Sequence, residues 1–263
     1  MAEMMAAQAE VAIPATEGFS QGAMPTIRKT VEILGWGVVA ILMITGFMSI
    51  FGRAEFLQSA YEQGVTDGIA AFDLFDGRYF DHDVATWLHL IPAFLIFGLG
   101  PLQFIRRIRT RHLSFHRWSG RIWLVAGFIV ALSGSFIGVL YPFMDITGQG
   151  FNESMATLFL ALYTLLSLSM AYYHIRRRNF GSHREWMIRS WALMLAVATE
   201  RLLLVFFMST TPVGVEVLFG TTFWMAGLLN IAASECWINL TRTPGNGARH
   251  WKDLDARARQ ANS

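Results

Sequence analysis

The stretch IWLVAGFIVALSGSFIGVLY, residues 122–141, contains 20 residues and no charged side chain. At a rise of about 1.5 Å per residue, a helix of this length covers about 30 Å, which is the thickness of the hydrocarbon core of a bilayer. Backbone N–H and C=O groups in lipid must be hydrogen-bonded within the chain, and a helix achieves this within one segment. The stretch therefore predicts a membrane-spanning helix.

Five further apolar runs of similar length surround this stretch, at residues 31–50, 85–105, 155–174, 186–208 and 218–240. We therefore expect an all-α integral membrane bundle of six transmembrane helices over residues 31–240, which we number in chain order as spans 1 to 6. A flexible tail is expected at 1–30 and a second tail at 241–263. The composition agrees, because only 15% of the residues are charged, against about 25% in soluble domains. A disordered, fibrous or nucleic-acid-binding chain is excluded by the same shortfall.

The basic residues predict the orientation. Of the 21 Lys and Arg residues, 18 lie before span 1, between spans 2 and 3, between spans 4 and 5 (counting Arg189 in the first turn of span 5), or after span 6, and only Arg53, Arg78 and Arg201 lie elsewhere. Loops rich in Lys and Arg stay in the cytoplasm. We expect a protein of the inner membrane with both termini cytoplasmic, its basic loops in contact with anionic lipid headgroups.

Two of the basic loops resemble each other. The first reads HRWSGRIW (residues 116–123) and the second reads HREWMIRSW (residues 183–191), and a one-residue gap at Glu185 aligns their His, Arg and Trp positions. Each motif opens a span, so spans 2–3 and spans 4–5 are predicted to be two helical-hairpin repeats flanked by spans 1 and 6. Binding sites often lie at the interface of such repeats.

These motifs, together with Gly100-Pro-Leu-Gln-Phe104, resemble an uncharacterised group of bacterial multi-pass membrane proteins that is classified as a domain of unknown function. The resemblance covers about residues 85–240. It implies a membrane protein and supplies no activity that could be carried onto these positions.

Ionisable residues inside predicted spans are candidates for function, because they are expensive to place in lipid. Glu200 and Arg201 lie in span 5, and His89 lies near the outer end of span 2. Side chains of neighbouring helical residues point about 100° apart, so Glu200 and Arg201 are not expected to face each other. His89 is the expected partner of Glu200, either as a proton relay or as part of a structural hydrogen-bond network.

A second group is predicted under the basic loops. Arg121 and Arg189 occupy matching repeat positions, and Glu235 of span 6 enters at the same depth. Guanidinium groups bind carboxylates and phosphates with paired hydrogen bonds. The group could hold a quinone, a haem propionate or an anionic headgroup, or its arginines could simply reach lipid phosphates.

A b-type haem would need two histidines that face each other from different helices. His116 and His183, at equivalent repeat positions, are the candidate pair, and they are metal ligands only if haem is present; His112 and His174 are alternatives at the loop edges. The alternative role of each histidine is interfacial anchoring. On the other side no second span histidine is available to pair with His89, which disfavours a two-haem path across the membrane.

Two further patterns have structural interpretations. Gly120, Gly127, Gly134 and Gly138 form a face of small residues on span 3, which predicts close helix packing or, alternatively, contact with a flat ring. The outer segment 51–84 is acidic and aromatic and is expected to be a solvated loop. Its spacing around Asp81 and Asp83 does not match a calcium-binding loop.

Three functions remain open. The first is an accessory protein that binds quinone or haem near the cytoplasmic face, through His116, His183, Arg121, Arg189 and Glu235. The second is a proton-coupled carrier that uses His89, Glu200 and Arg201. The third is a structural subunit of a larger membrane complex. The sequence has no nucleotide-binding or hydrolase motif, and its one cysteine, Cys236, excludes a disulfide framework.

Overall fold

The computed structural model describes residues 23–72, 74–143, 148 and 150–242, and the regular structure in these ranges is entirely helical. Six segments in the described part are long and apolar enough to cross a membrane, which confirms the six predicted spans. The predicted tails, apart from residues 23–30 and 241–242, lie outside the described residues.

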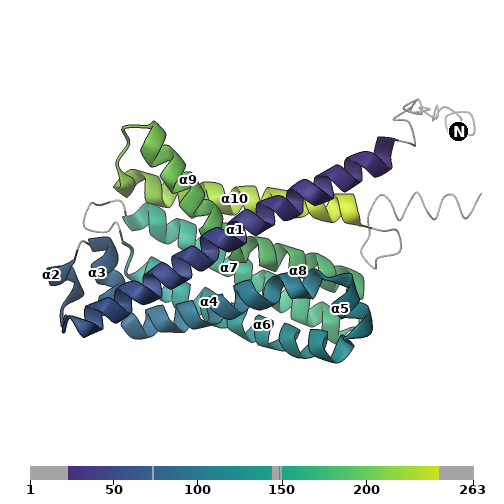
Figure 1. Ribbon diagram of the computed structural model, residues 1–263, viewed down its shortest axis with the longest axis horizontal. Coiled ribbons are helices and arrows are strands. Elements are labelled where there is room, and N and C mark those ends of the chain that lie inside the picture. The colour runs from purple at the N-terminus through teal and green to yellow at the C-terminus, as the bar shows by residue number, and fades with distance from the viewer. Residues whose placement is uncertain (1–22, 73, 144–147, 149, 243–263) are drawn as a thin grey trace, which may run out of the picture. The chain divides into compact units, whose positions relative to one another are not determined.

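The elements follow one another along the chain as Figure 1 shows. They are α1 (Ala23–Glu62), α2 (Gly68–Ala71), α3 (Leu74–Asp81), α4 (Asp83–Phe104), α5 (Arg106–Arg111), α6 (Leu113–Ser135) with the π-helical turn η1 (Phe136–Leu140), α7 (Gly150–Arg176), α8 (Phe180–Met194), α9 (Ala196–Thr210) and α10 (Val215–Thr241). We call the end that holds α2 and α3 the α3 end, and the opposite end of the bundle the α5 end.

Spans 2 to 6 form one packed bundle. Helix α4 packs against α6, α6 against α7, and α7 against α8, and these four run side by side in Figure 1. Helix α10 packs against α7, α8 and α9, so span 6 lies beside the second predicted hairpin. The pairs α4–α6 and α7–α8 are the contacts that two hairpins need, and the equivalence of the two halves stays a prediction.

Span 5 is broken into two helices at Leu195, where a single helix was predicted. Helix α8 ends at Met194 and α9 begins at Ala196, and Figure 1 shows α9 leaving the direction of α8. The amide of Asn230 on α10 donates to the carbonyl oxygen of Ala192 at 2.8 Å. A side chain that bonds a helix carbonyl is a recognised cause of a break, so Asn230 supports this one.

The outer segment 51–84 is helical rather than a loop, which corrects the prediction. Helix α1 continues to Glu62, and α2 and α3 follow. The carboxylates of the segment accept local hydrogen bonds: Asp67 accepts from the backbone N–H of Ala70 at 3.0 Å, and Asp81 accepts from that of Gly68 at 2.6 Å. The acidic side chains thus cap and connect the short helices.

The chain divides into two compact units, residues 1–39 and residues 40–263. In the first, the apolar side chains of α1 are exposed, with Ile33 63% and Leu34 64% accessible. In the second, residues 40–62 of α1 pack against α4 through aromatic rings: Phe47 lies 5.8 Å from Phe94 and 5.8 Å from Phe97, centroid to centroid.

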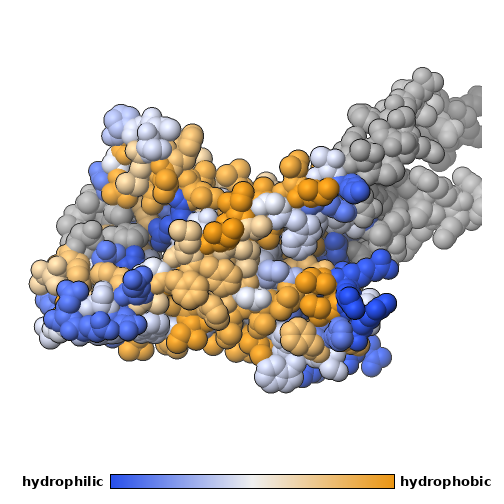
Figure 2. All heavy atoms as spheres, viewed as in Figure 1, coloured by the Kyte–Doolittle hydropathy of each residue, from blue (hydrophilic) through white to orange (hydrophobic). Residues whose placement is uncertain are grey.

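The glycine face of α6 serves helix packing. A Cβ atom at Gly127 would lie 3.1 Å from Leu168 of α7, one at Gly134 would lie 3.0 Å from His89 of α4, and one at Gly138 would lie 2.9 Å from Thr157. The small residues therefore let α4 and α7 approach α6, as the packing interpretation predicted. On the face in Figure 2, hydrophobic residues cover the middle of the helices and hydrophilic residues gather towards the two ends.

Candidate functional site

The motifs that carry the family resemblance meet near the α5 end. The indole of Trp191 on α8 lies directly over Gly100 of α4, so that a Cβ atom there would overlap the ring. Phe104 packs against the same indole at a centroid distance of 5.9 Å, and Trp123 of α6 at 6.2 Å. Trp191, the last tryptophan of the second motif, thus contacts residues of the other two.

The polar atoms of this group are satisfied internally. The indole N–H of Trp123, which is fully buried, donates to the carbonyl oxygen of Ile96 at 3.2 Å. The amide of Gln103 donates to the hydroxyl of Ser119 at 2.7 Å. Buried polar groups need such partners. We refer to Gly100, Gln103, Ser119, Trp123 and Trp191 as the motif core, and its arrangement is that of a packing centre.

The predicted group of two arginines and one carboxylate forms only in part. Arg189 binds Glu235 with two hydrogen bonds, from Nε to Oε1 and from Nη2 to Oε2, the second at 2.9 Å. The Arg189 guanidinium also lies over the ring of Trp186, 4.6 Å from its centroid. Arg121 is exposed and makes no hydrogen bond or ion pair with the described part of the chain. The matching repeat positions therefore have different surroundings.

A second ion pair nearby was not foreseen. The carboxylate of Glu185 accepts a hydrogen bond from Nη2 of Arg242 at 3.3 Å, and Nε lies 2.8 Å from Oε1 as an ion-pair contact; each side chain is only 7% exposed. Glu185 is the residue of the second motif that has no counterpart in the first, so the alignment of the two motifs already set it apart. The partner could not be foreseen because Arg242 lies 57 residues further along the chain.

His116 lies near the start of α6, and His183 lies near the start of α8. The Nδ1 atom of His183 lies 2.9 Å from the carbonyl oxygen of Ala171 and donates to it, because a carbonyl only accepts. The Nδ1 atom of His116 is buried, with no hydrogen-bond partner among the described residues. The haem hypothesis for this pair stays a prediction.

At the α3 end, Glu200 and Arg201 contact each other, which corrects the expectation that neighbours cannot pair. The Nη1 atom of Arg201 lies 3.3 Å from Oε2 of Glu200, because the long arginine side chain bends around the helix. Glu200 is fully buried, and its Oε1 atom lies 3.3 Å from the hydroxyl of Thr222, which also lies 2.9 Å from the carbonyl oxygen of Leu218. The predicted partner His89 instead contacts Ser133, whose hydroxyl oxygen lies 3.2 Å from Nδ1.

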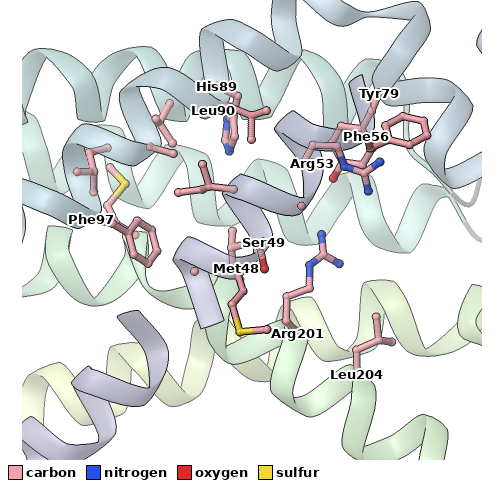
Figure 3. Close-up of a pocket in the computed structure, with 18 of the residues that line it drawn as sticks. Met48, Ser49, Arg53, Phe56, Tyr79, His89, Leu90, Phe97, Arg201 and Leu204 are labelled. Atoms are coloured by element: carbon pink, nitrogen blue, oxygen red, sulfur yellow. The ribbon is translucent and has the colours of Figure 1, made fainter. Parts of the chain in front are cut away.

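A cavity of about 630 Å³ lies at this end, among α1, α3, α4, α6, α9, the last residue of α8 and the first residue of α10. Its volume is in the range of sites for small molecules. Most of its wall is apolar, formed by side chains such as Leu90, Phe97, Val197 and Leu204. Figure 3 shows the imidazole of His89 reaching into the cavity from α4 and the guanidinium of Arg201 reaching into it from α9.

Four more polar side chains line the cavity: Ser49, Arg53, Asp76 and Tyr79. Arg53 makes an ion pair with Asp76, and its guanidinium lies over the ring of Tyr79, 3.8 Å from the centroid. These four residues were not foreseen. A signal existed for one of them, because Arg53 and Arg201 are two of the three basic residues outside the basic loops.

The cavity combines features suited to a lipid-soluble ligand with a polar headgroup. Its apolar wall can hold a ring or a hydrocarbon chain, and guanidinium, imidazole and hydroxyl groups can fix polar atoms. Among the residues predicted from sequence, His89 and Arg201 share this space, and Glu200 lies behind Arg201. The group at the α5 end, in contrast, is occupied by its own ion pairs.

Comparison with known proteins agrees with this architecture. The family model described as "Predicted membrane protein (DUF2306)" matches residues 86–238, which contain spans 2 to 6 up to the last turn of α10. No curated protein and no solved structure matches the chain. The matched region includes the whole motif core and excludes α1, which supplies one wall of the cavity. The chain therefore belongs to the predicted membrane protein family DUF2306.

Proposed function

We propose that this protein binds a lipid-soluble small molecule with a polar headgroup in the cavity at the α3 end. The observation that supports the proposal is an apolar cavity of about 630 Å³, inside the predicted membrane spans, with His89 and Arg201 on its walls. Ionisable groups at such a depth are costly and mark functional sites. The proposal keeps the predicted class of ligand, a quinone-like molecule, and moves its site away from the basic loops.

The contacts at the two ends favour this location. At the α5 end, the carboxylate of Glu235 accepts two hydrogen bonds from the guanidinium of Arg189. A ligand that binds Arg189 would therefore have to break this ion pair. At the α3 end, Arg201 lines open space while retaining its contact with Glu200. A guanidinium carries five N–H donors, so Arg201 can bind a ligand oxygen without losing Glu200.

Filling the cavity tests the proposal. Ala93 is 8% exposed and lines the cavity, so Ala93→Trp places an indole in the space of the ligand. Ala232→Trp, on the exposed surface of α10, is the control for adding a large ring to the same protein. Protein purified in mild detergent is extracted with organic solvent, and the extract is analysed by mass spectrometry.

We expect a lipophilic compound in stoichiometric amount in extracts of the wild type and Ala232→Trp, and its loss from folded Ala93→Trp. Added short-chain quinones should also raise the melting temperature of the first two proteins and not of the third. A wild-type protein that carries no compound and is not stabilised by any added quinone would overturn the proposal.

For the orientation, we propose that the α5 end faces the cytoplasm across an inner membrane. Four arginines within the six residues of α5 support this, together with the exposed Arg176 at the end of α7 and the exposed Arg177 and Arg178 that follow it. Such clusters attract anionic headgroups. Single cysteines at Arg109 and Gly64 in a chain with Cys236→Ser should react with an impermeant maleimide from opposite sides of the membrane.

Transport coupled to protons is a second candidate, favoured by the position of Glu200. This carboxylate is fully buried, and its Oε2 atom has no hydrogen-bond partner in the described part of the chain, although Arg201 lies 3.3 Å away. Glu200→Gln should abolish proton-coupled flux in proteoliposomes while the folded protein is retained. Unchanged flux in this variant would exclude Glu200 from the coupling.

The haem hypothesis and the subunit hypothesis have direct tests. Haem between His116 and His183 would give a Soret band that shifts on reduction with dithionite and is lost in His116→Ala/His183→Ala. A structural subunit would co-purify with stable partner proteins after mild solubilisation. A featureless spectrum, or a protein that purifies alone, would remove the corresponding hypothesis.

A further inference from the structure

The hydrogen bonds around His89 fix which of its ring nitrogens carries the proton. The hydroxyl of Ser133 donates to the carbonyl oxygen of Ile129 at 2.7 Å, and a hydroxyl has only one hydrogen. With this hydrogen on the shorter contact, to Ile129, the Ser133 oxygen accepts from Nδ1 of His89, 3.2 Å away. When the imidazole is neutral, its proton is on Nδ1, and Nε2 is an acceptor.

The Nε2 acceptor lies on the side of the His89 ring that faces away from α6. A Cβ atom at Gly134 would lie 3.0 Å from Cε1 and 3.3 Å from Nδ1 of His89, so the Nδ1–Cε1 edge faces α6. His89 lines the cavity, and Figure 3 shows its ring pointing into that space. The side of the ring that carries Nε2 is therefore the one available to a ligand.

Ser49 offers a second acceptor on the opposite wall, from α1. Its hydroxyl donates to the carbonyl oxygen of Thr45 at 2.9 Å, which leaves the oxygen lone pairs for another donor. Ser49 lines the same cavity as His89. The cavity thus presents two acceptors, Nε2 of His89 and Oγ of Ser49, and a ligand that satisfies either must supply a hydrogen-bond donor.

The part of the cavity towards α3 has the opposite character. Arg53 and Arg201 bring guanidinium groups to it, and both keep carboxylate partners, Asp76 and Glu200. Because each cation is already balanced by an anion, a fully charged ligand gains little there. A neutral oxygen that accepts a hydrogen bond from Arg201 suits this end better.

We propose that the ligand is a lipid-soluble hydroquinone or a closely related phenol, bound with one hydroxyl donating to Nε2 of His89. This inference rests on the proposed function and specifies its ligand. The second ring oxygen accepts from the guanidinium of Arg201, and the aromatic ring lies among the apolar side chains of α4 and α9. The oxidised quinone lacks the donor and leaves the His89 acceptor without a partner.

The lipid side of the cavity is suited to a hydrocarbon tail. Met48 and Gly52 of α1 line the cavity, and both are exposed, with Met48 70% accessible. The wall formed by α1 therefore reaches the surface that faces lipid. A ligand can enter from the bilayer along α1 and keep its tail there while its ring occupies the cavity.

The test compares the two redox forms of one molecule. A decyl-substituted benzohydroquinone, the matching benzoquinone and the hydroquinone dimethyl ether are titrated into the purified full-length protein, under anaerobic conditions for the hydroquinone. We expect the hydroquinone to bind about tenfold more tightly than the quinone, as one net hydrogen bond provides. The dimethyl ether, which has no donor, should bind no better than the quinone.

Variants at His89 assign the preference to this residue. In His89→Phe, hydroquinone affinity should fall to that of the quinone, while quinone affinity changes little. In His89→Gln, which can place an amide oxygen near the position of Nε2, part of the preference should return. His112→Phe, at an exposed histidine before α6, should behave as the wild type.

The outcomes separate the two proposals. Equal binding of hydroquinone and quinone to the wild type, or a preference that survives in His89→Phe, would overturn this inference and leave the cavity as a lipophilic site. Failure of all three compounds to bind, together with no effect of Ala93→Trp on extracted compounds, would remove the proposed function itself.

Discussion

The two ends of the bundle use charge differently. At the α5 end, Glu185 with Arg242 and Glu235 with Arg189 form compact ion pairs beside a core of tryptophans and small residues. At the α3 end, Arg201 and His89 line open space instead of closing it. The motifs by which the chain resembles its family lie at the first end and along α4, while the cavity at the second end has no recognisable motif.

This difference shows that a specific motif does not have to be a binding site. Trp191 is placed by Gly100, and Trp123 by a carbonyl of α4, so these residues set how spans 2, 3 and 5 approach each other. The cavity is a consequence of that approach and of α1. We therefore expect substitutions at the α5 end to lower stability, and substitutions in the cavity to lower ligand binding.

The largest loss of stability is expected for Arg242→Ala. Removal of the guanidinium takes an ion-pair partner from the 7% exposed carboxylate of Glu185, which costs about 3–5 kcal/mol of unfolding free energy. Denaturant unfolding in detergent measures the change. The double variant Glu185→Ala/Arg242→Ala should recover part of the loss, and a single variant as stable as the exposed-site control Arg176→Ala would contradict the prediction.

A smaller loss is expected for Gly100→Ala. The added methyl group overlaps the Trp191 indole, and overpacking of this kind costs about 1–3 kcal/mol. Gly98→Ala is a matched control on the same helix, because nothing lies within 4 Å of a Cβ atom there. Equal unfolding midpoints for the two variants would mean that Trp191 moves freely and that the motif core does not fix the packing.

The Arg189–Glu235 pair is expected to contribute less. Glu235 is 40% exposed, and pairs of this kind contribute about 0.2–1 kcal/mol. A double-mutant cycle with Arg189→Gln and Glu235→Gln measures the coupling energy. A coupling as large as the effect at Arg242 would break the distinction between the buried pair and the exposed one.

The smallest change in stability is expected for Ser49→Ala in the cavity. Only the local hydrogen bond to Thr45 is lost, so the unfolding free energy should change by about 0.5 kcal/mol. Hydroquinone binding should weaken more than quinone binding in the same variant. Ser59→Ala, which removes a similar local bond to Phe56, is the control, and equal effects of both on binding would exclude Ser49 from the site.

The six spans could be predicted from the sequence because each is a long apolar segment. Length and hydrophobicity are properties of the segment alone and need no knowledge of its neighbours. The interruption at Leu195 was missed, since it depends on Asn230 from another helix. The helices in 51–84 were missed for a related reason: their caps and ion pairs join residues from separate turns, such as Arg53 and Asp76. His89, Glu200 and Arg201 were found because charge is rare inside a span, yet their partners were assigned wrongly.

The sequence by itself determined that this protein is a six-span helical membrane protein, and predicted on which side its arginines gather. Those properties follow from the surrounding bilayer, because helices with apolar surfaces are the ones that are stable in lipid. Only the tertiary structure decided that Arg201 and His89 share a cavity, that Arg121 and Arg189 differ, and that Trp191 fits over Gly100. Such contacts depend on how helices are rotated and bent against one another, and hydrophobic periodicity is weak in a segment that is apolar on all sides.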